Sequence, residues 1–257
     1  MDDAALLEAL PGFAFAFVLV LARTSMTVML MPGLGEADPP PTIRAGIALA
    51  ITVLLLPIIA PLVPAVPDSG MASAGMVTAE LCVGALLGWL ARLPVLALTM
   101  AGSVVSYMVG LSNVVQTDPA LGGQSAAMAR LFGLVAPVLV LSTGLYALPL
   151  SALAGSYDLV APGTLLPAGP LADTIATGVS FSVGLAIRLS APFLLIGTVF
   201  QVGLGLLARL VPQLQPYGAA VPGQILGGLA LLAILALPML TYWTDAVRSA
   251  WSVLPGL

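Results

Sequence analysis

The chain has 257 residues, of which 60% are hydrophobic and only 7% are charged, with a formal net charge of −4. Soluble domains carry about 25% charged residues, so this composition excludes a soluble protein and predicts an integral membrane protein. At about 20 residues per span, the length allows roughly six or seven membrane-spanning helices. The apolar runs are continuous rather than alternating, which excludes a membrane β-barrel. We therefore predict an all-α membrane protein.

The sequence contains no histidine, and its seven basic residues are all arginines that are scattered along the chain. The absence of histidine and lysine removes the commonest general base, the commonest metal ligand and the residue of Schiff-base chemistry. Scattered arginines on an acidic chain provide no basic surface suited to nucleic acid. We therefore expect no enzymatic activity, no cofactor, no metal site and no nucleic-acid partner.

Seven apolar segments follow one another along the chain, separated by loops rich in proline and glycine. Proline lacks the backbone N–H and clashes with the preceding turn, so these clusters mark helix ends. The predicted helical segments are 11–34, 43–64, 71–93, 95–115, 127–153, 171–211 and 218–243. The predicted connections include 32–41, 64–70, 110–124 and 155–170.

Charged residues inside apolar segments are the first candidates for a functional role, because an intramembrane charge is costly unless it has a partner. Glu80 is the sharpest case, and the absence of histidine and of other nearby acids argues against a proton relay within this chain. We expect Glu80 to make a buried polar contact, with Arg23 or Arg92 as candidate partners. Arg188, near the middle of 171–211, is likewise expected to be buried or to take part in assembly.

Small residues recur at four-residue spacing, which lets two helix backbones approach closely in a membrane. The predicted packing residues are Gly84, Gly88, Gly102, Ser106, Gly223 and Gly227. The spacing leaves open whether the neighbouring helix belongs to this chain or to another subunit.

The segment 110–124, GLSNVVQTDPALGGQ, is polar, bounded by glycines and surrounded by apolar runs. Irregular polar backbone is tolerated among membrane helices only where protein buries it or where it lines a watery path. Asp118 and Pro119 favour a turn. The residues leave two alternatives, an ordinary interhelical loop and a mobile constriction. Its candidate functional residues are Gly110, Ser112, Asn113, Gln116, Asp118, Pro119, Gly122, Gly123 and Gln124.

The run 171–211 would form a helix of about 60 Å, near twice the ~30 Å thickness of a hydrocarbon core. Either the helix breaks at Pro192 into two short spans, or it is one kinked rod. The turn that follows contains Pro212, Gln213 and Gln215, and the run 218–243 then returns. A long hairpin packed against other protein chains fits this length better than a hairpin surrounded by lipid.

Together these residues resemble a known family. The matching residues, in chain order, are Arg23, Met31-Pro32, Arg44, Glu80 with Gly84 and Gly88, Gly110, the run 118–124 (DPALGGQ), Gly144, Ser156-Tyr157, Pro162, Pro192 and Val211-Pro212-Gln213. In this order they resemble the FliR family of the flagellar type III export apparatus, over nearly the whole chain. Gln215, Leu145 and Gln224 depart from the residues that are common in the family.

The resemblance implies a single-copy core subunit that assembles with FliP and FliQ into a helical pore for unfolded flagellar proteins, with FlhB at the pore entrance. It implies that residues 1–170 are FliP-like, that residues 171–257 form a FliQ-like helical hairpin, and that the loop 110–124 plugs the closed pore. The expected location is the bacterial inner membrane, as a multi-pass protein in contact with lipid in the flagellar basal body.

Three alternatives remain: a virulence-type secretion gate subunit, a small-solute transporter and an intramembrane enzyme. A transporter of this kind predicts two similar halves with paired broken helices, and the sequence has no convincing internal repeat.

Overall fold

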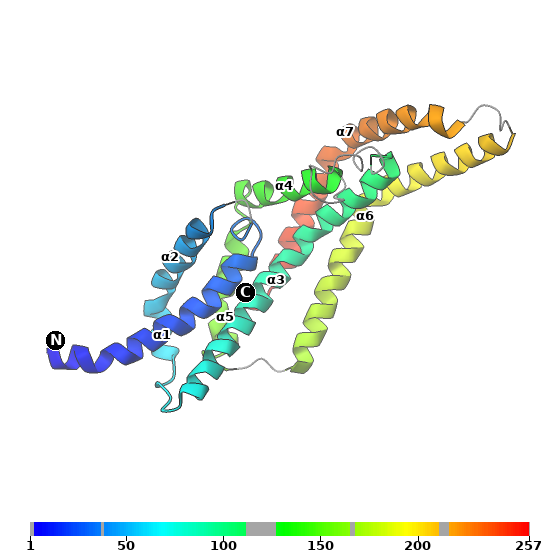
Figure 1. Ribbon diagram of the computed structural model, residues 1–257. Coiled ribbons are helices and arrows are strands. Elements are labelled where there is room, and N and C mark those ends of the chain that lie inside the picture. The colour runs from blue at the N-terminus through cyan, green and yellow to red at the C-terminus, as the bar shows by residue number, and fades with distance from the viewer. Residues whose placement is uncertain (1–2, 37–38, 112–126, 165–167, 211–215, 257) are drawn as a thin grey trace. The chain divides into compact units, whose positions relative to one another are not determined.

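The computed structural model describes residues 3–36, 39–111, 127–164, 168–210 and 216–256 (Figure 1). All its regular elements in these ranges are helices, which confirms the prediction of an all-α protein. They are α1 (Asp3–Leu30), α2 (Pro41–Ile59), the 3₁₀ turn η1 (Ala60–Leu62), α3 (Gly70–Val109), α4 (Ala127–Ser142), α5 (Ala147–Leu159), α6 (Ala168–Leu210) and α7 (Pro216–Trp251).

Within the described ranges, five helices are long and apolar enough to cross a membrane: α1, α2, α3, α6 and α7. Helices α4 and α5 pass the same test only as a pair, and they are bent by 70° at the break between them. The number of candidate spans is therefore five, or six if the bent pair is one span. This agrees with a membrane protein and lies at or below the lower end of the expected six or seven.

Helix α3 differs from the sequence-based expectation of two helices, 71–93 and 95–115. It is one helix of 40 residues that continues through Pro94. Two fully buried tryptophans donate to backbone oxygens beside this proline: Trp251 Nε1 to Ala91 O at 3.0 Å and Trp243 Nε1 to Pro94 O at 3.1 Å. The bonds satisfy the two buried indole N–H groups and tie Trp243 and Trp251 to carbonyls of α3 close to Pro94.

Helix α6 decides between the two alternatives for Pro192. It is a single helix of 43 residues with Pro192 inside it, so the run does not break into two short helices. Helix α7 has 36 residues and also continues through its internal prolines, Pro222 and Pro238. The structure therefore favours long rods over paired half-helices.

The chain divides into two compact units. The first contains residues 1–93, 140–178 and 248–257, and the second contains residues 94–139 and 179–247. The two units are defined by contacts within the structure, whereas the predicted parts 1–170 and 171–257 are defined by resemblance to other proteins. That division stays a prediction.

In the first unit, α1 packs closely against α3 at two of the predicted small residues. A Cβ atom on Gly84 would overlap the carbonyl oxygen of Arg23, and one on Gly88 would lie 2.7 Å from Leu30 Cβ. Thr27 Oγ1 also donates to the Gly84 carbonyl at 3.1 Å. These glycines therefore serve packing within the chain, because only hydrogen at these positions permits this helix separation.

In the second unit, Gly102 brings α3 against α4, since a Cβ there would lie 2.8 Å from Ala129 Cα. Gly223 and Gly227 of α7 behave differently: both are exposed, and nothing described lies within 4 Å of a Cβ on either. The glycine of α7 that packs within the unit is Gly228, where a Cβ would lie 2.5 Å from a Val109 methyl group. A single residue step rotates the helix by about 100°, which places Gly228 on the contact face and Gly227 off it.

We predict that Gly84→Ala destabilises the protein by about 1–3 kcal/mol, because the new methyl group must push α1 away from α3. Gly75→Ala is the matched control on the same helix, since its Cβ meets nothing within 4 Å. That control should be neutral or slightly stabilising, as alanine favours helix over glycine. The thermal unfolding midpoint in detergent measures both effects, and equal midpoints for the two variants would contradict the packing role of Gly84.

Candidate functional site

The first unit contains a buried ion pair between α1 and α3. Arg23 Nε donates to Glu80 Oε2 at 2.7 Å, and Arg23 Nη2 donates to Glu80 Oε1 at 2.9 Å. Both side chains are fully buried. The two parallel bonds form the bidentate geometry in which an arginine–carboxylate pair is strongest. Arg23 is therefore the partner of Glu80, from the two candidates that the sequence offered.

The remaining polar atoms of this pair bind α5 and the segment after it. Arg23 Nη1 donates to Ser156 Oγ, and Nη2 donates to the Val160 carbonyl, each at 3.1 Å. The backbone N–H of Gly163 donates to Glu80 Oε1 at 2.7 Å. The ring of Tyr157 lies 4.0 Å from the Arg23 guanidinium carbon, a cation–π distance. The ion pair thus joins three regions of the first unit that are far apart in the sequence: α1, α3, and α5 with the segment after it.

This arrangement fits a structural role better than a catalytic one. Each carboxylate oxygen of Glu80 accepts at least one hydrogen bond, and three donors in total bind this carboxylate. A carboxylate that binds three fixed donors of its own chain is placed as a structural contact rather than as an acceptor of a substrate proton. Among the described residues, no group of three Cys, Asp or Glu side chains is placed to hold a metal ion.

The other two arginines singled out in the sequence lie elsewhere. Arg92 donates to Glu36 Oε2 at 3.3 Å and to the Leu30 carbonyl at 3.2 Å, and its side chain is 29% exposed. It is therefore partly buried and does not contact Glu80. Its hydrogen bonds link α3 to the end of α1 and to the segment that follows α1.

Arg188 is exposed, so of the two expectations, burial or a role in assembly, this chain by itself does not provide the first. The buried face of α6 is set by Leu185, Leu189 and Phe193, which recur every four residues. Arg188 lies about 100° from Leu189 around the helix, outside this face. An assembly role, in which another chain covers Arg188, stays a prediction.

The second unit contains the base of the predicted loop 110–124. Helix α3 ends in a Schellman motif: Gly110 has a φ of 82°, its N–H donates to Tyr107 O at 3.2 Å, and the N–H of Leu111 donates to Ser106 O at 3.0 Å. Glycine adopts this left-handed conformation without strain, so Gly110 stops the helix directly before the loop.

Ser106 also contacts the other side of the same loop. Its Oγ accepts a hydrogen bond from the Met128 N–H at 3.0 Å, in the first turn of α4. Ser106 is fully buried, and the first N–H groups of a helix have no partner within the helix. One residue therefore bonds the end of α3 and the start of α4.

The middle of the predicted loop and the turn of the hairpin lie outside the described residues. These predicted residues are Ser112, Asn113, Gln116, Asp118, Pro119, Gly122, Gly123 and Gln124 in the loop, and Pro212, Gln213 and Gln215 in the turn.

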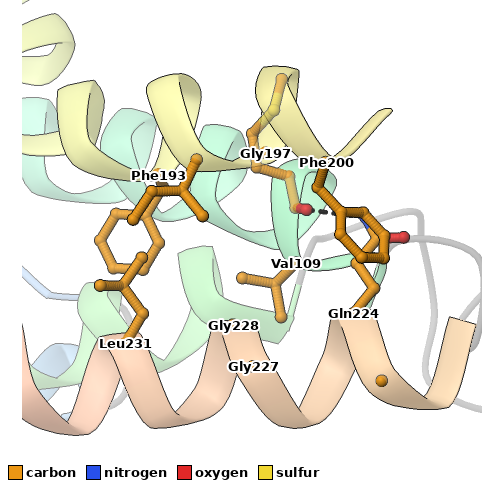
Figure 2. Close-up of a pocket in the computed structure, with 11 residues that line it drawn as sticks. Val109, Phe193, Gly197, Phe200, Gln224, Gly227, Gly228 and Leu231 are labelled. Atoms are coloured by element: carbon orange, nitrogen blue, oxygen red, sulfur yellow. Dashed lines mark hydrogen bonds between the residues drawn. The ribbon is translucent and has the colours of Figure 1, made fainter. Parts of the chain in front are cut away.

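Gln224 makes a contact between helices that the sequence analysis did not predict. Its Nε2 donates to the Met108 carbonyl at 2.8 Å and so joins α7 to the end of α3 (Figure 2). The signals in the sequence were a lone amide within an apolar run and a departure from the residue that is common in the family. Gln224 lies at the edge of a cavity of about 170 Å³. The other residues that line it are mainly apolar or glycine: Met108, Val109, Phe193, Ile196, Gly197, Phe200, Gly223, Gly227, Gly228 and Leu231.

Comparison with known proteins matches most of the chain to one protein family. Residues 14–250 match the family described as bacterial export proteins, family 1. The flagellar biosynthetic protein FliR of Caulobacter vibrioides is 32% identical over 242 residues, covering 92% of this chain and 96% of that protein. FliR of Escherichia coli is 27% identical over 84% of this chain and 82% of its own length. The surface presentation of antigens protein SpaR of Salmonella typhimurium is 27% identical over 66% of this chain and 63% of its own length.

We predict that Arg23→Met destabilises the protein by about 3–5 kcal/mol, because it leaves the Glu80 carboxylate buried without its partner. The double variant Arg23→Met with Glu80→Met should recover part of this loss, since it removes both buried charges together. Arg92→Met is the matched control at a partly exposed pair and should cost about 1 kcal/mol or less.

Thermal unfolding midpoints of the four proteins, the wild type included, measure this series. The interpretation fails if the double variant is less stable than Arg23→Met alone, or if Arg92→Met is as harmful as Arg23→Met.

Proposed function

The chain belongs to the bacterial export proteins, family 1, and from this membership we propose that it is a single-copy core subunit of the flagellar type III export gate. As a member of this family it is a component of a type III export apparatus and a multi-pass membrane protein. In the proposed role it assembles with homologues of FliP and FliQ around a pore that conducts unfolded flagellar proteins, and FlhB contacts the entrance.

The observation that carries this proposal is the exposure of two unusually long apolar helices. Only 11% of the most apolar stretch of α6 and 6% of that of α7 are buried within the chain. Helix α6, with 43 residues, is about 65 Å long, whereas a hydrocarbon core is about 30 Å thick. Lipid can cover roughly half of such a helix, so other protein chains are needed to cover the rest.

The exposed faces of α6 and α7 have the composition of a helix-packing surface. The large exposed apolar residues include Ile187, Leu195, Ile196, Val199, Val202, Leu206 and Leu210 on α6, and Leu226, Ile234 and Leu237 on α7. Gly223 and Gly227 are open at four-residue spacing on the same helix pair, which suits close approach of a further helix. We assign this surface to the neighbouring gate subunits, with α6 and α7 as the FliQ-like hairpin of residues 171–257.

The FliP-like part, residues 1–170, supplies the proposed plug. The loop 110–124 contains one charge, Asp118, and amide and hydroxyl side chains. Its described ends are tied to each other through Ser106, which supports a loop that is presented from a fixed base. A plug of low charge can close a pore without selecting among the many polypeptides that must pass it.

The flagellar branch is favoured over the virulence branch by similarity. FliR of Caulobacter vibrioides matches 92% of this chain at 32% identity, whereas SpaR of Salmonella typhimurium matches 66% at 27%. The corresponding location is the bacterial inner membrane, at the flagellar basal body. No specific observation favours the transporter or the enzyme alternative. Pro192 lies inside a continuous helix, whereas a transporter of this kind predicts broken helices. The carboxylate of Glu80 binds three donors of its own chain, which favours a structural role over a catalytic one.

We predict that the chain is stable and monodisperse in detergent only when it is co-expressed with its FliP and FliQ homologues, because α6 and α7 need protein cover. Native mass spectrometry of the purified complex should give one copy of this chain per assembly. A monodisperse chain that transports small solutes alone in liposomes would contradict the proposed function.

We predict that deletion of residues 114–121 makes the assembled gate leaky to ions, because the plug is removed while its base remains. Asp118→Asn is the matched control, since it changes charge but not length, and it should leave the leak unchanged. Ion flux through liposomes that contain the whole complex measures the leak. Unchanged flux and unchanged secretion in the deletion variant would remove the plug assignment.

A further inference from the structure

Arg188 is an exposed charge within the apolar helix α6, a candidate membrane span. Among the described residues, its side chain has neither an ion pair nor a hydrogen bond. The next charges along α6 are Asp173 and Arg209, which lie 15 and 21 residues away, about 22 and 31 Å along the helix. A charge in such a helix is costly unless it has a partner, so a counter-charge must come from outside the described chain.

The residues around Arg188 form one outward face of α6. Leu189 and Phe193, which are buried, lie about 100° and 140° from Arg188 around the helix axis, so this face turns away from the core. Between residues 181 and 202, the positions within about 40° of Arg188 are Phe181, Gly184, Pro192, Leu195, Val199 and Val202. We call these residues, with Arg188, the Arg188 face. Its four large apolar side chains are between 39% and 68% exposed.

The spacing along this face is that of a helix-packing seam. Phe181, Arg188, Leu195 and Val202 follow one another at intervals of seven residues. Apolar residues at this interval pack one helix along another, and a single polar residue among them selects the register.

Gly184, one turn before Arg188, favours a helix over lipid as the cover of this face. Nothing described lies within 4 Å of a Cβ at this position, so the glycine serves no packing within the described chain. A small residue lets the backbone of another helix approach closely, here beside the guanidinium group. Lipid chains need no such approach, and glycine is a poorer helix former than alanine.

We propose that the Arg188 face binds a helix of a neighbouring subunit, and that this helix carries one aspartate or glutamate opposite Arg188 within an apolar seam. The inference rests on the proposed function, which supplies the neighbouring subunits, and it adds the chemistry of the partner. Arginine binds a carboxylate through two parallel hydrogen bonds, which makes the pair directional. The pair fixes the register of the two helices, because a shift by one turn leaves both charges covered and unpaired.

Photocrosslinking in the complete complex identifies what covers the face. A benzophenone amino acid in place of Leu195 should form an adduct with another protein subunit. The same probe in place of Val183 is the matched control, because Val183 is also exposed but lies about 140° from Arg188 around the helix, and it should link to that subunit several-fold less. Adducts of the Leu195 probe with lipid alone or with a second copy of this chain overturn the proposal, and so does equal linkage at the two positions.

A charge series at position 188 tests the ion pair. Arg188→Glu should lower the amount of partner subunit recovered per copy of this chain more than tenfold, because it places two negative groups against each other in the seam. Arg188→Lys keeps the charge and should retain most of the partner. Arg188 is exposed in the chain, so these variants should keep its fold, and the level of the chain in membranes checks this.

Gln201→Glu is the matched control for the series. Gln201 is exposed on α6 and lies about 140° from Arg188 around the helix, so a negative charge there should leave recovery of the partner within twofold of the wild type. Equal recovery in Arg188→Glu and Gln201→Glu overturns the proposal.

Reversal of the partner's acidic residue completes the test. The crosslinked peptide identifies the partner helix, and an arginine in place of its acidic residue should restore at least half of the recovery in the Arg188→Glu background. If no acidic residue of that helix restores recovery when it is replaced in this way, the ion pair is wrong.

The outcomes separate this inference from the proposed function. A complex that contains one copy of this chain and tolerates Arg188→Glu keeps the proposed function and removes the inference. A Leu195 adduct with an acidic helix of a protein outside the flagellar export gate, together with loss of that protein in Arg188→Glu, removes the proposed function and keeps the Arg188 face as a binding surface.

Discussion

A chain in which 60% of the residues are hydrophobic must satisfy its buried polar groups from within, and this constraint explains the contacts that organise each unit. This constraint is strongest for the Arg23–Glu80 pair, because two fully buried charges are tolerable only when each is paired and hydrogen-bonded. The buried indole N–H groups of Trp243 and Trp251 likewise find partners within the chain, because they donate to backbone carbonyls of α3. In each case a polar atom binds together segments that are distant in the sequence.

The helices fall into two groups according to how this chain covers them. In α3, 61% of the most apolar stretch is buried within the chain, whereas in α6 and α7 the values are 11% and 6%. All three are comparably apolar, so composition does not separate them. Burial separates them: this chain leaves most of the apolar surface of α6 and α7 uncovered, as it does that of α2, of which 17% is buried. A subunit of a larger assembly is expected to show this division.

The hydrogen bonds of Ser106 and Gln224, near the described ends of the loop 110–124, are weaker than the Arg23–Glu80 ion pair. Each is a neutral hydrogen bond of about 1 kcal/mol, whereas loss of one partner from a buried ion pair costs about 3–5 kcal/mol. The ion pair of the first unit is therefore the stronger of the two sets of contacts.

The sequence by itself determined the class of protein, the all-α fold, the close-packing glycines Gly84 and Gly88, and a C-terminal hairpin too long for a simple span. These follow from composition and local spacing, which depend only on neighbouring residues. Family membership rested on the order of the motifs. The DPALGGQ segment was recognisable for the same reason, although its structure is outside the described residues.

Only the tertiary structure decided which residues meet. It chose Arg23 over Arg92 as the partner of Glu80, and it brought the indoles of Trp243 and Trp251 to α3 carbonyls that lie 149 and 160 residues away in the sequence. It also placed Arg188 at the surface and brought Gln224 to the end of α3. Local patterns show that a buried charge or an open carbonyl needs a partner, but the partner's identity depends on how distant helices pack against each other.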